Sequence, residues 1–256
     1  MKILFTICGR AGSKGIKNKN VQMFCGYPLP LYTLSAIDCY LREHPECQAD
    51  IALNTDSLEL TQILCSNTKL TVNFIERKKE LAGDLVAKKD VILDSLIEME
   101  KRKNTVYEMV IDLDLTSPLR TVDNIQSLIN KMRSSQADVV FSVVPSRRSP
   151  FFNMVSKSSI TNSYERIIPT NYTARQEAPE VFDMNASLYA YKCSHLKKGL
   201  GALEGYNEII HMYDTGILDL DHENDLLLMQ IIADYLFSKN SEFSKIQKNI
   251  PSLLNI

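Results

Sequence analysis

Metal-binding patterns of cysteine and histidine are missing from this 256-residue sequence. Its six cysteines form no CxxC pair, and its four histidines form neither HxH nor HExxH. These absences argue against a zinc site, and a disulfide framework is not expected in a chain of this length. We therefore expect the thiols to be reduced.

Long apolar runs and a strong net charge are also missing. The N-terminal apolar run, residues 3–8, is too short for the core of a signal peptide. A later run, residues 226–233, is interrupted by Gln230 and falls far short of a membrane span. The formal charge of −2 argues against a protein that binds nucleic acid through its backbone. We expect a soluble, cytoplasmic protein with neither a nucleic-acid nor a membrane partner.

Apolar segments of strand and helix type alternate along the first 144 residues. The expected strands are 3–8, 49–54, 70–75, 106–113 and 138–144, and the expected helices are 28–42, 58–65, 91–99 and 122–132. Short connections between alternating strands and helices are typical of a parallel sheet covered by helices on both faces. The sequence therefore predicts an α/β fold with three layers (α/β/α) and a mostly parallel sheet.

The regular alternation of strands and helices ends after residue 144. Residues 145–181 are rich in Ser, Arg, Pro and Asn and are expected to form a projecting excursion. Later strands are expected at 186–191 and 208–213, and a helix at 226–237. We predict one domain over residues 1–237 and a polar, peripheral tail over 238–256.

The loop after the first strand, residues 9–20, combines three glycines with several basic residues. Glycines let backbone N–H groups approach phosphate oxygens, and Arg10, Lys14 and Lys19 would add positive charge. The loop matches neither the Walker A pattern nor GxGxxG. The alternative is a solvated basic turn that follows a surface strand.

Ligands of parallel sheets bind beyond the carboxyl ends of the strands. The loop 9–20, the pair Thr55–Asp56 and the turn 116–120 all follow strands at that edge, so we expect them to converge. Near the other end of the chain, Asp219 and Asp221 stand two residues apart. On an extended segment this spacing puts both carboxylates on one face, which suits a hard divalent cation. The alternative is that Asp221 caps the following helix.

Six segments, in this order, resemble the motifs of the acylneuraminate (nonulosonate) cytidylyltransferases, or CMP-sialic acid synthetases. They read GRAGSKGIKNKN, TD, RKKELAGD, LTSPLR, RQEAPEVFDMNASLY and LDLDHEND. The matching residues are Arg10, Ser13, Lys14, Gly15, Lys19, Asn20, Thr55, Asp56, Arg77, Glu80, Leu81, Ala82, Asp84, Thr116 to Arg120, Arg175, Gln176, Pro179, Phe182, Asn185, Tyr189, Asp219, Asp221 and Asp225. The resemblance spans residues 1 to about 232.

This resemblance implies a Rossmann-like nucleotidyltransferase fold and a reaction between CTP and an acidic nine-carbon sugar. The anomeric hydroxyl of the sugar would attack the α-phosphorus and release pyrophosphate. Magnesium would be the cofactor, and residues 145–181 would pack against a second subunit, making a homodimer. Such chemistry depends mainly on charge neutralisation and in-line positioning.

The resemblance also implies a role for each matching residue. The catalytic residues would be Arg10, Lys14 and Lys19; the nucleotide would be bound by Ser13, Gly15, Asn20, Arg77, Ala82, Gly83 and Asp84; the sugar would be bound by Asp114, Thr116, Ser117, Arg120, Arg175, Gln176 and Asn185; and Asp219 and Asp221 would hold Mg²⁺.

Three of these arginines also have a simpler interpretation. Arg77 stands beside Lys78 and Lys79, so it can belong to a solvated basic run. Arg120 can neutralise Asp112 or Asp123. Arg175 can be a surface arginine of a flexible arm.

Three departures from the family pattern bear on the substrate. Asp114 stands where sialic-acid-specific members usually have glutamine, and members with aspartate there resemble enzymes that act on legionaminic acid and related diamino sugars. Phe151 and Phe152 replace an HPxK pattern, which leaves one contact to the substrate carboxylate in doubt. An apolar pair in a loop would fit a dimer interface. Lys88 replaces a small hydroxyl residue near the base.

Three functions compete on the sequence alone. The first is a CMP-nonulosonate synthetase, either of the legionaminic acid type or a CMP-N-acetylneuraminate synthetase proper. The second is a nucleotidyltransferase that uses another nucleotide and a sugar phosphate. The third is a non-catalytic nucleotide-binding module, which would not need an acidic pair opposite the triphosphate.

Overall fold

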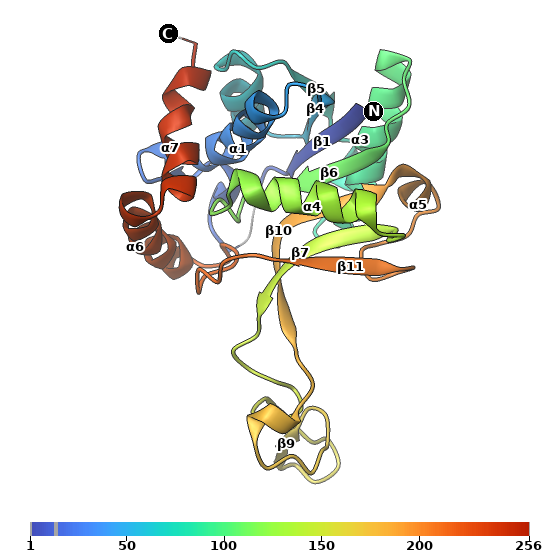
Figure 1. The fold of residues 1–256 in the computed structure, drawn as a ribbon, viewed down its shortest axis with the longest axis vertical. Helices are drawn as coiled ribbons and strands as arrows, with labels where there is room; N and C mark the ends of the chain where they lie inside the picture. The colour runs from blue at the N-terminus through green and yellow to red at the C-terminus, as the bar shows by residue number, and fades with distance from the viewer. Residues whose placement is uncertain (1, 13–14, 256) are drawn as a thin grey trace.

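A seven-stranded sheet forms the centre of the molecule (Figure 1). The structure is a computed structural model and describes residues 2–12 and 15–255. The strands are β1 (Lys2–Gly9), β4 (Gln48–Thr55), β5 (Val72–Glu76), β6 (Met109–Leu113), β7 (Val139–Pro145), β10 (Phe182–Lys192) and β11 (Asn207–His211). Their order is β11-β7-β10-β6-β1-β4-β5, and β10 alone runs antiparallel to its neighbours. The predicted mostly parallel sheet is confirmed.

Strand β1 lies inside the sheet, between β6 and β4, and has apolar residues on both faces. Ile3, Phe5 and Ile7 point into the larger core, whereas Leu4 points into the smaller one on the opposite face. A strand buried on both faces reads as a continuous apolar run because its side chains alternate between two cores. The end of this strand therefore opens directly into the loop that begins at Gly9.

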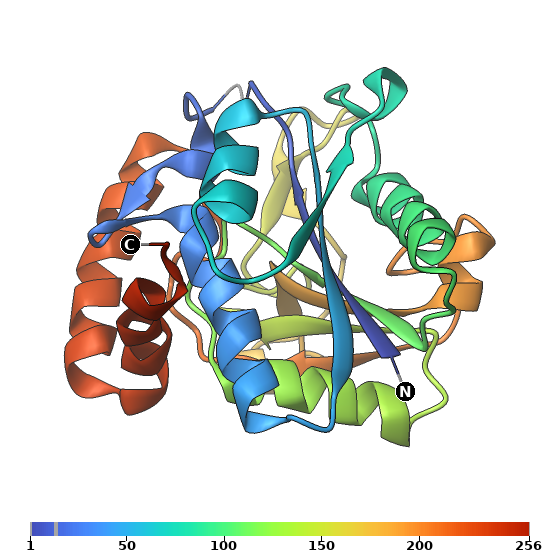
Figure 2. The same cartoon turned by 90° about the horizontal axis from the view of Figure 1, so that it is seen from above.

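Helices cover both faces of the sheet and give the predicted three layers. The larger core receives α1 (Leu29–Glu43), α2 (Leu58–Thr61), α4 (Val122–Ser134), α6 (Glu223–Lys239) and α7 (Ser241–Leu253), and the smaller core receives α3 (Lys88–Lys103) and α5 (Cys193–Lys197). Figure 2 shows α3 and α5 across the sheet from α1, α6 and α7. No helix in the described part of the chain is long and apolar enough to cross a membrane.

The expected strands and helices up to residue 144 all occur, with ends that differ by a few residues. Ser57 caps α2, because its side chain accepts a hydrogen bond from Leu60 N at 3.2 Å. A short hairpin that the sequence did not suggest, β2 (Met23–Phe24) with β3 (Tyr27–Pro28), precedes α1.

The C-terminal segment differs from the prediction of a polar, peripheral tail. It forms α7, whose residues Phe243, Ile246, Ile250 and Leu253 are buried in the larger core. Ser35 of α1 donates a hydrogen bond to Ile246 O at 2.6 Å. The apolar residues recur every three or four positions, so a largely polar segment still buries one helical face. The predicted end of the domain at residue 237 is therefore wrong, because α7 packs into the same core as the rest of the domain.

The segment 145–181 projects from the sheet, as predicted, and carries the hairpin β8 (Val155–Lys157) with β9 (Tyr164–Arg166) (Figure 1). Phe152 is partly buried inside the excursion, where the Arg166 guanidinium lies 5.7 Å from the centre of its ring. Several large apolar side chains are exposed: Met154, Val155, Ile160, Tyr164, Ile167 and Ile168. The role of this excursion in forming a dimer stays a prediction.

Candidate active site

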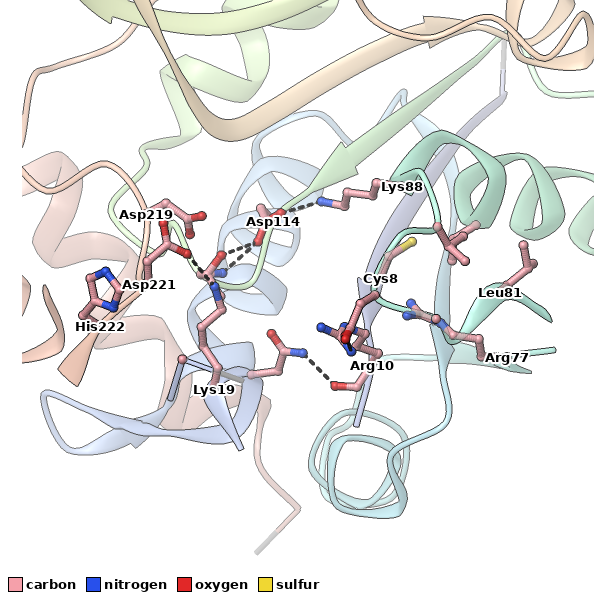
Figure 3. Close-up of a pocket in the computed structure, with 17 residues that line it drawn as sticks. Cys8, Arg10, Lys19, Arg77, Leu81, Lys88, Asp114, Asp219, Asp221 and His222 are labelled. Atoms are coloured by element: carbon pink, nitrogen blue, oxygen red, sulfur yellow. Dashed lines mark hydrogen bonds and ion pairs between the residues drawn. The ribbon is translucent and has the colours of Figure 1, made fainter. Parts of the chain in front are cut away.

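A cleft of about 570 Å³ lies at the carboxyl ends of β1 and β6 (Figure 3). Its lining is Cys8, Arg10, Gly15, Lys19, Asn20, Arg77, Leu81, Gly83, Asp84, Val86, Lys88, Val91, Asp114, Thr116, Asp219, Asp221 and His222. Residues from four segments that are far apart in the sequence thus meet in one site. Ser13 and Lys14, two predicted site residues, lie outside the described residues.

The first loop is fastened at both ends. Asn20 Nδ2 donates to Arg10 O at 3.0 Å, and Ala11 N donates to Asp56 Oδ1 at 2.7 Å. At Gly15 a Cβ atom would lie 2.3 Å from the carbonyl oxygen of Asp221. Only glycine fits there, because the loop packs against the backbone of the segment that carries the acidic pair.

Two cations of this loop pair with acids across the cleft. Arg10 Nη1 lies 2.5 Å from Asp84 Oδ1, and Lys19 Nζ lies 3.3 Å from Asp221 Oδ1. The Asp221 side chain is 68% exposed, so this second pair stands in water, where ion pairs are weak. The acids hold both cations over the open cleft. A triphosphate, which offers more charge, can replace them as partner.

Arg77 is buried, with 8% of its surface exposed, although two lysines follow it. Its Nε donates to Asn54 Oδ1 at 3.2 Å and its Nη2 to Asn54 O at 2.9 Å. Burial lowers the pKa of its guanidinium, which still carries its charge. The interpretation of Arg77 as part of a solvated run is therefore wrong. The side chain is locked against β4 and forms one wall of the cleft.

The turn after β6 is held together by Arg120, which is 1% exposed. Its Nη2 donates to the carbonyl oxygens of Asp114 and Ser117. Among the described residues the guanidinium forms no direct ion pair with Asp112 or Asp123, although the negative charges of Asp114 and Asp112 stabilise its positive charge. Burial lowers the pKa of Arg120. Arg120 lies behind the cleft and fixes the path of the turn.

Three further predicted residues do not line the cleft. Ser117 Oγ donates to Asn185 O at 2.9 Å and to Leu218 O, and Asn185 Oδ1 accepts from Ser142 Oγ at 2.5 Å. These bonds join the β6 turn to β10 and to the acidic segment. Ala82 follows the 3₁₀ turn Lys79–Leu81 and is not among the residues that line the cleft.

Arg175 and Gln176 lie outside the main cleft. They line a separate cavity of about 580 Å³ at the base of the excursion, where Arg175 Nη2 donates to Ser146 O at 2.6 Å. Within one chain these two side chains are therefore not brought to Asp114 and Thr116. Their role as a clamp for the sugar carboxylate stays a prediction.

Asp219 and Asp221 both line the cleft, while Leu220 between them is fully buried. The predicted arrangement of the two carboxylates on one face is thus present. Burial raises the pKa of Asp219, and the negative charge of Asp114 raises it further. Such a carboxylate is stabilised by a cation. No cluster of three or more acidic, histidine or cysteine ligands occurs in residues 2–12 and 15–255.

Helix α6 begins at Glu223, and its N-cap residue is His222, not Asp221. Asp225 Oδ2 accepts hydrogen bonds from Asp221 N at 3.0 Å and from His222 N at 2.7 Å. Asp225 thus reaches back from the first turn of the helix to the N–H groups of the N-cap residue and of the residue before it. The alternative that Asp221 caps the helix is wrong, and its carboxylate remains available to the cleft.

The sequence placed Lys88 near the base but did not reveal its ion pairs with Asp112 and Asp114. Lys88 Nζ lies 2.7 Å from Asp112 Oδ2 and 2.6 Å from Asp114 Oδ2. Asp114 Oδ1 also accepts from Thr116 N at 2.9 Å and from its hydroxyl at 2.7 Å. A usable signal existed, because the alternation in Asp112-Leu113-Asp114 places two carboxylates on one face of a strand end, where a cation is needed.

A model of the family described as "Cytidylyltransferase" matches residues 4–200, most of the chain. The chain belongs to the cytidylyltransferase family. It is 30% identical to post-translational flagellin modification protein B of Campylobacter coli, over 90% of this chain and 94% of that protein. It is 31% identical to CMP-N,N'-diacetyllegionaminic acid synthase of Campylobacter jejuni, with the same coverage of both chains.

Solved structures share the fold of this cytidylyltransferase. A structure of CMP:2-keto-3-deoxy-manno-octonic acid synthetase complexed with CTP has a TM-score of 0.63 at 14% identity and covers 92% of this chain and 99% of its own. A 4-diphosphocytidyl-2C-methyl-D-erythritol synthase of Anaerococcus prevotii has a TM-score of 0.59 at 12% identity, over 91% of this chain and 99% of its own. The expected nucleotidyltransferase fold is confirmed.

Proposed function

We propose that this cytidylyltransferase activates a nonulosonic acid with CTP and releases pyrophosphate. The observation that carries the proposal is the cleft itself, where Arg10 and Lys19 face the acidic pair Asp219 and Asp221. The similarity to a CMP-N,N'-diacetyllegionaminic acid synthase over nearly the whole of both chains supports an acidic sugar as the acceptor.

The nucleoside end of CTP fits the wall formed by residues 77–91. Leu81, Val86 and Val91 supply apolar lining, and Arg77 closes it with a fixed guanidinium. A planar base packs on apolar side chains, while polar groups at the edge of such a pocket set its orientation. Gly83 lets the backbone approach the base closely, which suits reading of the base by backbone N–H and C=O groups.

The triphosphate would lie between the first loop and the acidic pair. Arg10 and Lys19 would neutralise charge that builds up on the phosphates and hold the α-phosphorus in line with the anomeric hydroxyl of the sugar. Lys14, which lies outside the described residues, is expected to add a third cation. The bond that forms joins the sugar oxygen to the α-phosphorus, and the bond that breaks frees pyrophosphate with its electron pair.

Asp219 and Asp221 fit a magnesium ion. Mg²⁺ commonly binds one or two carboxylates together with substrate phosphates and waters, and these two oxygen donors line the same face of the cleft. When bound, Mg²⁺ would neutralise the triphosphate and lower the pKa of a coordinated hydroxyl. Asp225 and the packing of Gly15 hold the backbone of this segment in place.

The sugar would lie against Asp114 and Thr116. We favour legionaminic acid or a relative, on the aspartate at position 114 and on the named Campylobacter relatives. The cleft of one chain shows no described arginine or lysine from the excursion. We therefore infer a homodimer in which the excursion of one subunit supplies Arg175 to the site of the other. Because CTP is a cytoplasmic nucleotide, we place the enzyme in that compartment.

Pyrophosphate release tests the proposal directly. CTP, UTP, GTP and ATP would each be combined with magnesium and with legionaminic, pseudaminic and N-acetylneuraminic acid. We expect turnover with CTP only, and fastest turnover with legionaminic acid. Turnover with a sugar phosphate and none with any acid would favour the alternative nucleotidyltransferase. Binding of CTP without turnover on any acceptor would favour a binding module.

A further inference from the structure

Lys88 is the first residue of α3 and reaches into the cleft from the side opposite Asp219 and Asp221 (Figure 3). Its ammonium lies within hydrogen-bonding distance of two carboxylates, one from Asp112 and one from Asp114. The Lys88 nitrogen thus lies between two carboxylates at the end of β6. A metal ion at the same point would have one oxygen ligand from each of them.

The two carboxylates need this cation. Asp112 is fully buried, and its Oδ1 accepts from Thr6 Oγ1 at 2.8 Å. Burial alone would raise the pKa of Asp114, yet the charge and hydrogen bond of Lys88, with two hydrogen bonds from Thr116, lower it well below its usual range. Two carboxyl groups that both lie within 2.7 Å of one nitrogen need a cation between them to share the site.

The acidic pair on the opposite wall is held differently. Asp221 is paired with Lys19 at 3.3 Å in an exposed position, whereas the Lys88 contacts are shorter and reach a fully buried acid. A divalent cation can therefore compete for Asp219 and Asp221. It competes less readily at Asp112 and Asp114, because the Lys88 ammonium already lies 2.7 Å and 2.6 Å from their carboxylates and stays attached to the first turn of α3.

We propose that Lys88 is a resident cation that takes the place of a second metal ion, so that the enzyme binds a single divalent cation at Asp219 and Asp221. Lys88 is a positioning residue that acts through Asp114. It fixes that carboxylate against Thr116 and keeps it out of the coordination sphere of a metal. This proposal rests on the proposed function, which gives the metal site at Asp219 and Asp221. It adds an explanation of why Asp112 and Asp114 bind no metal ion.

Metal binding to the purified protein tests this without turnover. Mn²⁺ would be titrated into the wild type and into Lys88→Met, and the EPR signal of free Mn²⁺ would give the number of ions bound. We expect an additional Mn²⁺ site in Lys88→Met, which Lys88→Met/Asp114→Leu loses because leucine offers no oxygen ligand. Equal Mn²⁺ binding by wild type and Lys88→Met would overturn the proposal, as would an additional site that survives the Asp114→Leu change.

Two control variants distinguish the effect of losing the Lys88 charge from the effect of disturbing the packing around it. Lys89, the next residue, donates to Gly199 O at 2.6 Å and does not line the cleft, so Lys89→Met should bind Mn²⁺ like the wild type. Lys88→Arg keeps a cation and should also gain no site. An additional site in either control would show that general loss of packing, not loss of the ammonium, admits the metal, and would overturn the proposal.

Loss of Lys88 can prevent folding, because it leaves a buried acid unpaired. If it does, the same titration uses Lys88→Met/Asp112→Asn, which removes one charge of each sign and leaves two oxygen ligands. The additional Mn²⁺ site is expected there too, and its absence contradicts the proposal. Failure of the proposed function would show separately, as no pyrophosphate release by a wild type whose Mn²⁺ binding follows this pattern.

Discussion

The cleft and the excursion use their residues in opposite ways. Around the cleft, charged and polar side chains are fixed by named partners, such as Arg77 by Asn54 and Lys88 by Asp112. In the excursion, large apolar side chains face outward; Ile160 is 94% exposed. The polar side chains of the cleft have partners within one chain. We propose that the exposed apolar surface of the excursion, which also carries Arg175, contacts a second subunit.

The cleft should depend steeply on its acidic pair. Asp221→Asn is expected to lower kcat by roughly 10²–10³-fold, because the carboxylate that would hold the metal opposite Lys19 is lost. Steady-state rates with CTP and legionaminic acid measure this. Glu223→Gln, at an exposed position of the first turn of α6, is the matched control and should stay close to wild type. Equal effects of both changes would remove Asp221 from the site.

Substitutions in the core that supports the cleft should lower the free energy of unfolding more than substitutions in the excursion. Ile250→Ala in α7 removes a fully buried side chain and is expected to lower the free energy of unfolding by about 2–5 kcal/mol. Ile160→Ala in the excursion should change it by less than about 0.5 kcal/mol, since the side chain is exposed. Urea unfolding monitored by circular dichroism measures both. A small effect at Ile250 would mean that α7 is not part of the core.

The excursion should act on the site of the other subunit. Arg175→Ala is expected to lower kcat/KM for the sugar by roughly 10–100-fold, the loss of a charged hydrogen bond, while KM for CTP stays near wild type. Arg175→Ala and Asp221→Asn subunits would then be mixed to form heterodimers. Such a dimer carries one site with both residues intact, so mixing should restore activity. No recovery would place Arg175 outside the partner's site.

Asp114 should influence the choice of sugar more than the binding of CTP. Asp114→Asn or Asp114→Gln keeps a group that can accept from Thr116 but removes the charge beside Lys88. We expect a several-fold shift in relative kcat/KM among nonulosonic acids, at unchanged KM for CTP. A rise in KM for CTP alone would place Asp114 at the nucleotide.

The smallest expected effect is a pH dependence of stability. Burial opposes the charge on Asp114, but Lys88 and Thr116 outweigh it and lower the pKa below that of an unfolded aspartate. The stabilisation is therefore present above the unfolded pKa of roughly 3.9 and is lost as the pH falls toward the folded pKa. The difference in unfolding free energy between wild type and Asp114→Asn should be constant near neutral pH and shrink below about pH 4. A difference that grows in acid would contradict the Lys88–Asp114 pair.

Local sequence patterns predicted most of the fold and much of the cleft. Apolar runs indicated the strands, and the rule that parallel strands present ligands at their carboxyl ends correctly brought Arg10 and Thr116 to one cleft. Arg77 and Asp114 were expected there only from the family resemblance, and they line the cleft as well. The spacing of Asp219 and Asp221 likewise predicted two carboxylates that share a face. These features depend on periodicity along the chain, which is visible without knowledge of tertiary contacts.

What the sequence did not reveal depends on contacts between distant segments. Arg77 looked solvated because two lysines follow it directly in the sequence. Its hydrogen-bond partner Asn54 is distant in the sequence and could not be identified from it. Helix α7 looked peripheral because its composition is polar, although one face is apolar. Lys88 is close to Asp112 and Asp114 only because α3 begins beside the end of β6. Whether Arg175 enters a site depends on a second chain.

The fate of the α-phosphate tests the central claim most directly. CTP labelled at the α-phosphorus, and separately at the γ-phosphorus, would be incubated with enzyme, magnesium and legionaminic acid, and the products separated by chromatography. The account predicts that the α-label appears in a CMP-sugar and the γ-label in pyrophosphate. Appearance of the γ-label in a sugar phosphate would contradict it, because the cleft would then transfer the terminal phosphoryl group instead of the cytidylyl group.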